Sequence, residues 1–105
     1  MVQELSSTDF KKEIVEHKGI ALVDFWAPWC EPCKMLAPVI EKLAPRYSAK
    51  IKFAKIDIDE NSDIASEYGI MSIPCIVFFR DGKEIERMIG FKGEDALRVK
   101  LNTLM

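Results

Sequence analysis

The spacing of hydrophobic positions changes along the chain, and each change predicts a new element. An apolar stripe at helical spacing predicts a helix over residues 7–19, which Ser7 or Thr8 caps and Gly19 ends. The next residues, IALVDFWA at 20–27, are apolar at nearly every position. A continuous apolar run of this length is typical of a strand that is buried on both faces of a sheet.

The helical spacing returns after this strand and later gives way to strand patterns. Apolar side chains line one face of a predicted helix from Glu31 to about Tyr47. Further along, two β-rich runs flank Asp81-Gly82, a dipeptide that favours the tight turn of a β-hairpin. The elements predicted after residue 50 are a strand at 51–59, a short helix at 60–69 that Gly69 ends, the hairpin at 73–90 and an amphipathic helix at 93–105.

Together these elements predict an α/β protein. Helices and strands alternate in the first half of the chain, and a hairpin and a helix close the second half. A mixed sheet with helices on both faces is therefore the expected packing. A chain of 105 residues suits a single domain over residues 1–105, with a hydrophobic core that needs no stabilising cross-links.

Composition and charge argue against several classes of function. The chain is 49% hydrophobic and 30% charged, with a net charge of −2 and with both signs interspersed. Because no basic stretch stands out, we expect no nucleic-acid partner. No apolar run approaches the roughly 20 residues that span a bilayer, and the first residues lack the pattern of a secretory signal, so we expect no membrane partner either.

The segment WAPWCEPCK at 26–34 carries the most reactive side chains, two cysteines that are separated by two residues. They stand at a predicted strand-to-helix junction, where free N–H groups and the helix dipole stabilise a thiolate at Cys30. Cys33 follows one turn later on the same face, where its sulfur can form a disulfide after Cys30 has attacked a substrate. Pro32 suits the first helical turn, and neighbouring tryptophans, among them Trp29, supply apolar surroundings.

Two other interpretations of the cysteine pair are weaker. Structural zinc needs further ligands, and only Cys75 and His17 are left among cysteines and histidines to supply them. A purely structural disulfide across so short a loop adds little stability, because the loop-closure entropy is small. A redox centre is therefore the favoured interpretation, and we expect neither a metal nor another cofactor.

Asp24 interrupts the apolar run at 20–27, on the strand that leads into the cysteine pair. Burial disfavours the charged form of a carboxyl group, so the pKa of Asp24 should be raised. Such a carboxylate can accept the proton of Cys33 when that thiol has to attack. The alternative is that Asp24 is a satisfied buried acid paired with Lys55 on a neighbouring strand, and both hypotheses can hold at once.

These motifs give the chain a clear resemblance to a known family. The segment VDFWAPWCEPCKMLAP is very similar to the active-site segment of the thioredoxin family, in which WCGPCK is the usual form. The resemblance continues over nearly the whole chain, through AKIDIDEN, YGIMSIP and FFRDGKEIERMIG to the last helix. It implies a thioredoxin fold, with a central five-stranded mixed β-sheet flanked by four helices.

The resemblance also implies a protein-disulfide reductase that works by dithiol–disulfide exchange. In the family pattern Cys30 is the nucleophile, Cys33 resolves the mixed disulfide, and Asp24 accepts a proton with Lys55 near it. Pro74 matches the family's cis-proline, which faces the disulfide. The implied partners are disulfide-bonded proteins and a thioredoxin reductase, which recycles an enzyme that we expect to be monomeric and cytoplasmic.

A docking groove is implied around the cysteine pair, where the exposed backbone at Ile73 pairs with an extended segment of the substrate. The residues that the resemblance places along the groove are Trp29, Glu31, Pro32, Ile58, Ile73, Pro74, Gly90 and Phe91.

Three residues depart from the family pattern. Glu31 replaces the usual glycine, and its carboxylate should raise the pKa of Cys30 and make the disulfide harder to reduce. Cys75 replaces threonine after the cis-proline, either as a small side chain that fills the same slot or as a third thiol that forms a wrong disulfide, is modified or binds a soft metal. Phe91 replaces a small residue, and it either narrows the groove or covers the core.

Other functions fit parts of this pattern. An oxidant, isomerase or glutaredoxin-like enzyme usually carries other residues between its cysteines, and Pro32 argues against these classes, although Glu31 leaves a glutaredoxin-like role open. A binding module without turnover often lacks one or both cysteines, whereas here both are present together with Asp24 and Pro74. An iron–sulfur or metal carrier needs Cys75 as a further ligand.

Overall fold

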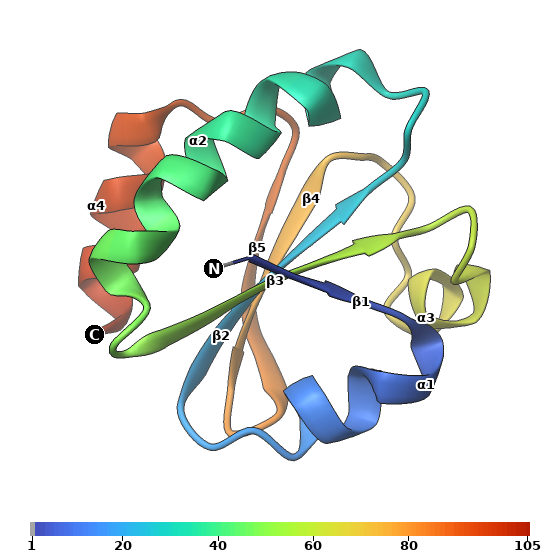
Figure 1. Cartoon of the computed structure of the whole chain (residues 1–105), viewed down its shortest axis with the longest axis horizontal. Coiled ribbons are helices and arrows are strands. Elements are labelled where there is room, and N and C mark those ends of the chain that lie inside the picture. Colours follow the sequence, from blue (N-terminus) through green and yellow to red (C-terminus); the bar gives the residue numbers. More distant parts are fainter. Residues whose placement is uncertain (1) are drawn as a thin grey trace.

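The computed structural model describes residues 2–105, and in this part of the chain five strands form one mixed sheet (Figure 1). The strands are β1 (Val2–Leu5), β2 (Ile20–Trp26), β3 (Ile51–Asp57), β4 (Cys75–Arg80) and β5 (Lys83–Ile89). Their order in the sheet is β1-β3-β2-β4-β5. β3 pairs in parallel with β1 and with β2, whereas β4 pairs antiparallel with both β2 and β5.

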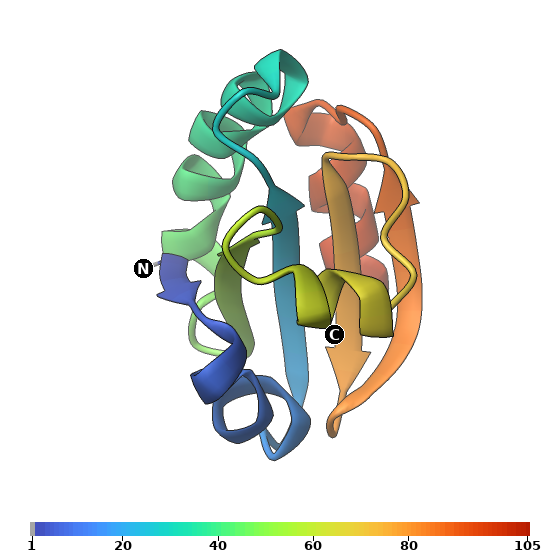
Figure 2. The same ribbon diagram turned by 90° about the vertical axis from the view of Figure 1, so that its right-hand side faces the viewer.

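Helices cover both faces of the sheet (Figure 2). They are α1 (Ser7–Phe10), which continues into the π-helical turn η1 (Lys11–Val15), α2 (Glu31–Tyr47), α3 (Ser62–Glu67) and α4 (Glu94–Leu104). On one face α2 and α4 contribute Leu36 and Leu97 to a buried cluster. On the other face α1 and α3 contribute Phe10 and Ile64 to a second cluster. The mixed sheet with helices on both faces confirms the predicted fold class.

The central strand β2 shows why its sequence is apolar almost throughout. Its side chains alternate, so that Leu22 joins the cluster under α2 while Val23 joins the cluster on the opposite face. Both faces are covered, and each of the first six residues of β2 is therefore buried. By the same alternation Asp24 lies on the face that α2 covers, at the end of the strand that leads to the cysteines.

The hairpin between β4 and β5 confirms the prediction made from Asp81-Gly82. Both residues have positive φ angles, 52° for Asp81 and 84° for Gly82, as a tight two-residue turn requires. The bounds of α2 also agree with the prediction, and Gly69, with a φ of 61°, follows the end of α3 as expected.

The first helix and the first strand differ from the prediction. Ser6, not Ser7 or Thr8, caps α1, because its N–H donates to the Asp9 carboxylate at 2.7 Å. The helical segment ends at Val15, so Gly19 does not end it. Gly19 instead binds the hairpin turn: its N–H donates to Asp81 Oδ1 at 2.7 Å, and its carbonyl accepts from the Asp81 N–H at 3.0 Å. The hydrophobic pattern also missed β1, which has only Leu5 fully buried.

Candidate active site

Cys30 lies at the N-terminus of the longest helix. It is the N-cap residue of α2, with extended backbone angles, and its sulfur accepts a hydrogen bond from the Cys33 N–H at 3.2 Å. This N–H is one of those that an α-helix leaves without an internal partner at its first turn. The helix dipole adds a positive potential at the same place, so the position favours a thiolate once the disulfide is reduced.

A disulfide joins Cys30 to Cys33, with their Cα atoms 5.2 Å apart. Both cysteines are buried, and together with Ala27 they form a small apolar cluster. The half-buried side chains of Ile58 and Ile73 pack against this cluster. The structure therefore brings these two predicted groove residues to the cysteine pair.

Asp24 is buried, with 3% of its surface exposed, in the strand that leads to the cysteines. Burial raises its pKa from 3.8 to about 7; the Lys55 ammonium opposes this rise, and the Glu4 carboxylate adds to it. Among residues 2–105, no group donates a hydrogen bond to Asp24 Oδ1. A buried carboxylate that takes up its proton near neutral pH is suited to proton transfer.

The position of Lys55 corrects one hypothesis. Its strand does lie beside that of Asp24, and the two residues are register partners. However, the Lys55 ammonium lies 3.7 Å from Glu4 Oε1 and 5.5 Å from the centre of the Trp26 ring, and it forms no ion pair with Asp24. Asp24 is therefore not the satisfied, lysine-paired acid of the alternative hypothesis.

Pro74 precedes β4, and its peptide bond with Ile73 is cis, as predicted. The Pro74 carbonyl accepts a hydrogen bond from the Gly90 N–H at 2.8 Å, which places the residues after β5 beside the cis-proline. Phe91 follows Gly90 and is 41% exposed. The structure thus supports the grouping of Gly90 with Pro74, while the effect of Phe91 on a substrate stays a prediction.

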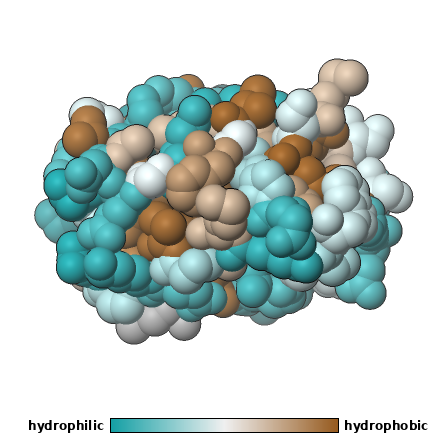
Figure 3. Space-filling model, turned by 90° about the horizontal axis from the view of Figure 1, so that it is seen from above, coloured by the Kyte–Doolittle hydropathy of each residue, from teal (hydrophilic) through white to brown (hydrophobic). Residues whose placement is uncertain are grey.

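Trp29 is the largest exposed apolar residue next to the disulfide, with 64% of its surface exposed. Its indole N–H donates to Asp59 Oδ2 at 2.8 Å. This contact joins the segment after β2 to the segment after β3, and the sequence did not predict it. Pro32 lies in the first turn of α2 as expected. Figure 3 shows this end of the molecule, where apolar residues gather in the middle of the face and hydrophilic residues surround them.

Two exposed methionines were not among the predicted groove residues. Met71 is 94% exposed and lies shortly before the cis-proline, and Met35 is exposed on the second turn of α2. Flexible, polarizable methionine side chains suit surfaces that bind many partners. Their position in the sequence near the two motifs was the only signal that could have pointed to them.

Glu31 is exposed at the start of α2, and its carboxylate accepts from the Lys34 ammonium at 3.1 Å. Lys34 thus offsets part of the negative charge beside Cys30. Since both side chains are well exposed, solvent screens the remaining interaction. The predicted effect of Glu31 on the redox chemistry should therefore be small.

Cys75 does not join the other cysteines. It is buried in the cluster on the face opposite α2, with Val77 and Phe79 of the same strand. Burial raises the pKa of the Cys75 thiol, which keeps it protonated and unreactive. This environment supports the hypothesis of a small core-filling side chain over that of a third reactive thiol.

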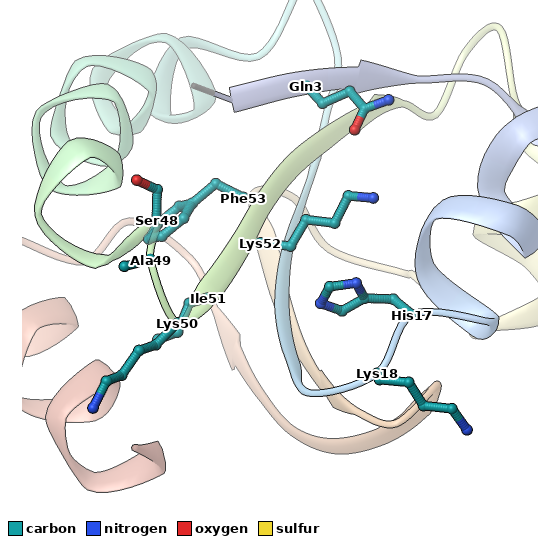
Figure 4. Close-up of a pocket in the computed structure, with 9 residues that line it drawn as sticks. All are labelled: Gln3, His17, Lys18, Ser48, Ala49, Lys50, Ile51, Lys52 and Phe53. Atoms are coloured by element: carbon teal, nitrogen blue, oxygen red, sulfur yellow. The ribbon is translucent and has the colours of Figure 1, made fainter.

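One surface pocket lies far from this chemistry. A pocket of about 410 Å³ opens at the other end of the sheet, before β2 and at the start of β3 (Figure 4). Four of its side chains are basic in type, namely His17, Lys18, Lys50 and Lys52. Lys18 and Lys50 point away from each other, and Lys52 is paired with Glu13. These charges do not converge on a ligand.

Within residues 2–105, no group of three or more His, Cys, Asp or Glu side chains is arranged to hold a metal ion. None of the helices in this described part is both long enough and apolar enough to cross a membrane. The cysteine pair therefore stands as the chemical feature around which the other candidate residues gather.

The site combines a cysteine pair at the N-terminus of a long helix, a buried carboxyl group in the strand that leads to the pair, and a cis peptide bond after Ile73, which packs against the pair. These features define an α/β thiol–disulfide oxidoreductase. The family model described as thioredoxin matches residues 1–103. The chain belongs to the thioredoxin family, whose members reduce protein disulfides.

Three curated relatives illustrate the similarity. Thioredoxin of Bacillus subtilis (strain 168) is 45% identical over 98 residues, which cover 93% of this chain and 94% of the relative. Thioredoxin 1 of Synechococcus elongatus is 45% identical over 86 residues, or 82% and 80% of the two chains. Thioredoxin of Pyropia yezoensis is 42% identical over 101 residues, or 96% and 94%. Similarity on this scale supports protein-disulfide reductase activity for this chain.

Proposed function

We propose that this chain, as one domain, reduces protein disulfides with Cys30 as the nucleophile and Cys33 as the resolving thiol. The observation that carries the proposal is the closed Cys30–Cys33 disulfide at the N-terminus of α2. The helix N-terminus stabilises the thiolate of the residue at its cap. Cys30 occupies the cap, and Cys33 lies one turn inside the helix.

The reaction starts from the dithiol form. The Cys30 thiolate attacks one sulfur of the substrate disulfide, and the other substrate sulfur leaves as a thiolate and takes up a proton. Cys33 then gives its proton to the Asp24 carboxylate and attacks the Cys30 sulfur. The second substrate sulfur leaves in the same way, so two electrons have passed to the substrate and the Cys30–Cys33 disulfide remains.

Asp24 is suited to this step because its pKa of about 7 lets it gain and lose a proton near neutral pH. Lys55, which lies on the neighbouring strand, stabilises the ionised form of Asp24. The substrate docks on the apolar face around Trp29, Ile58, Ile73, Pro74, Gly90 and Phe91, next to Glu31 and Pro32. A thioredoxin reductase then returns the enzyme to the dithiol form. In this proposal the enzyme works in the cytoplasm, as a monomer and without a cofactor.

Single-cysteine variants test the two roles. Cys33→Ser should accumulate a mixed disulfide between Cys30 and a disulfide-bonded peptide, because the resolving thiol is missing. Cys30→Ser should form no such adduct, since Cys33 lies inside the first turn of α2 and lacks the cap position. Intact-protein mass spectrometry identifies the adduct. An adduct of equal yield in both variants would contradict the assignment.

A second candidate is a binding module that docks partners without redox turnover, which the apolar face alone would permit. The Cys30→Ser/Cys33→Ser variant keeps this face but has lost the cysteine pair that exchanges disulfides. If the double variant still replaced the wild type in a disulfide-reduction assay with a thioredoxin reductase, the reductase proposal would fail. We expect no detectable reduction.

A further inference from the structure

Three charged side chains lie in one row across neighbouring strands. Glu4 of β1 is the register partner of Lys55 of β3, and Lys55 is the register partner of Asp24 of β2. Side chains in one row of a sheet point to the same face, which here is the face that α2 covers. The row runs from solvent to the interior: Glu4 is exposed, Lys55 is half-buried and Asp24 is buried.

The lysine in the middle of this row is held toward its outer end. Its ammonium lies 3.7 Å from Glu4 Oε1 and over the Trp26 ring, while Asp24 Oδ1 receives no hydrogen bond from the part of the chain that the structure describes. Glu4 and Trp26 also line a surface hollow of about 610 Å³. The Glu4–Lys55 pair therefore lies at the solvent side of the row, and the buried carboxyl group lies behind it.

The other groups around Asp24 do not replace this arrangement. On β4 the register partner is the uncharged Ile76, and the nearby thiol of Cys75 is protonated. On α2 the charged residues of the first turn, Glu31 and Lys34, are exposed and paired with each other. Asp57 of β3 also raises the pKa of Glu4, but it is not among the groups that shift the pKa of Asp24. Lys55 and Glu4 are thus the charged groups that act on Asp24.

We propose that Glu4 is a positioning residue for the proton acceptor: it holds the Lys55 ammonium at the outer end of the row, so that this ammonium does not pair with the buried carboxyl group of Asp24. This inference rests on the role of Asp24 proposed above. Two effects of the Glu4 carboxylate act in the same direction. Glu4 repels the ionised form of Asp24 directly, and it shares the one cation that would otherwise stabilise that form.

Glu4→Gln in the full-length oxidised protein tests the inference. Without the carboxylate, Lys55 is free to approach Asp24, which favours the ionised form. We expect the pKa of Asp24, followed by carbon-13 NMR of its carboxyl group, to fall by roughly half a pH unit, as is typical for one partly exposed neighbouring charge. Glu13→Gln is the matched control, because Glu13 pairs with Lys52, which lies on β3 like Lys55, and this pair is not among the groups that act on Asp24. It should leave the Asp24 titration in place.

Most of the effect of Glu4 should pass through Lys55, and only the direct repulsion between Glu4 and Asp24 should remain without it. In a Lys55→Met background, Glu4→Gln should therefore move the Asp24 titration much less than it does in the wild type. An unchanged titration in Glu4→Gln, or equal shifts with and without Lys55, would overturn the positioning role. Because NMR reports on the folded protein, a loss of stability in any variant does not imitate the result.

The rate of disulfide reduction separates this inference from the proposed function. If Asp24 is the proton acceptor, the acid limb of the pH–rate profile should move to lower pH in Glu4→Gln, by the same half unit, which is about threefold in rate on that limb. A moved titration with an unmoved rate profile would support the electrostatic role of Glu4 and overturn the catalytic role of Asp24.

Discussion

Replacing Asp24 with asparagine should stabilise the oxidised protein at neutral and alkaline pH, and the gain should grow with pH. The pKa of Asp24 is about 7 in the folded protein and 3.8 as the reference value for the unfolded chain. A carboxyl group with a raised pKa binds its proton more tightly when folded. Its contribution to stability is therefore complete below pH 3.8 and is lost as the pH rises toward and through 7.

The size of the effect follows from the two pKa values. Each pH unit between them corresponds to about 1.36 kcal/mol, so ionised Asp24 costs the folded state about 4 kcal/mol above pH 7. Roughly 3 kcal/mol of this cost develops between pH 5 and pH 9. Asp24 is 3% exposed, so little of the cost is relieved by solvent.

Denaturant unfolding of the oxidised proteins at a series of pH values and constant ionic strength measures the difference. Asparagine resembles the protonated acid in shape but does not ionise, so the two stability curves should run close together below pH 3.8 and separate as the pH rises from 3.8 through 7. Any constant offset reports the hydrogen bonding of the amide and not the charge. Asp95→Asn removes an exposed carboxylate of α4 and serves as the control, since its curve should stay parallel to the wild type. A constant gap between wild type and Asp24→Asn from pH 5 to pH 9 would refute the reasoning.

Three further changes have defined outcomes. Glu31→Gly should make the redox potential of the active-site disulfide less negative by only about 10 mV, because Lys34 and solvent screen the carboxylate. Equilibration with a dithiol buffer measures this potential. A much larger shift would show that the charge is not screened. Cys75→Ser should leave the same potential unchanged, and in the wild type the Cys75 thiol should react with a thiol reagent only after unfolding. Gly82→Ala should lower the free energy of unfolding by at least about 1–2 kcal/mol, because φ is 84° and the new Cβ would lie 1.9 Å from the carbonyl oxygen of Val15, the last residue of η1. Gly93→Ala is the control: its new Cβ meets no atom within 4 Å, so the loss of stability should be smaller.

Much of the fold could be predicted where a local pattern determines the structure. The buried strand β2, the helix α2 and the hairpin turn at Asp81-Gly82 were found in this way. The strand β1 was missed because it is short and has one fully buried residue, so its existence depends on pairing with β3. The local pattern predicts a helix end at Gly19 because the partner of this residue, the carboxylate of Asp81, lies 62 residues further along the chain.

The active site divides in the same way. Cys30 and Cys33 could be identified because they stand at a predicted strand-to-helix junction, and Asp24 because it interrupts an apolar run. Pro74 could be identified because it belongs to a recognisable motif. The partner of Lys55 could not be predicted, since the choice between Glu4 and Asp24 depends on the geometry of three adjacent strands.

The role of the Cys30–Cys33 pair is tested most directly by a redox titration. The protein is equilibrated across a series of dithiol–disulfide buffers, its free thiols are alkylated, and the intact protein is weighed and mapped. We predict that Cys30 and Cys33 oxidise together in one two-electron step at a strongly reducing midpoint while Cys75 stays a free thiol. A far more oxidising midpoint, or a disulfide that includes Cys75, would contradict the assignment of this chain as a thioredoxin-type reductase that works through Cys30 and Cys33.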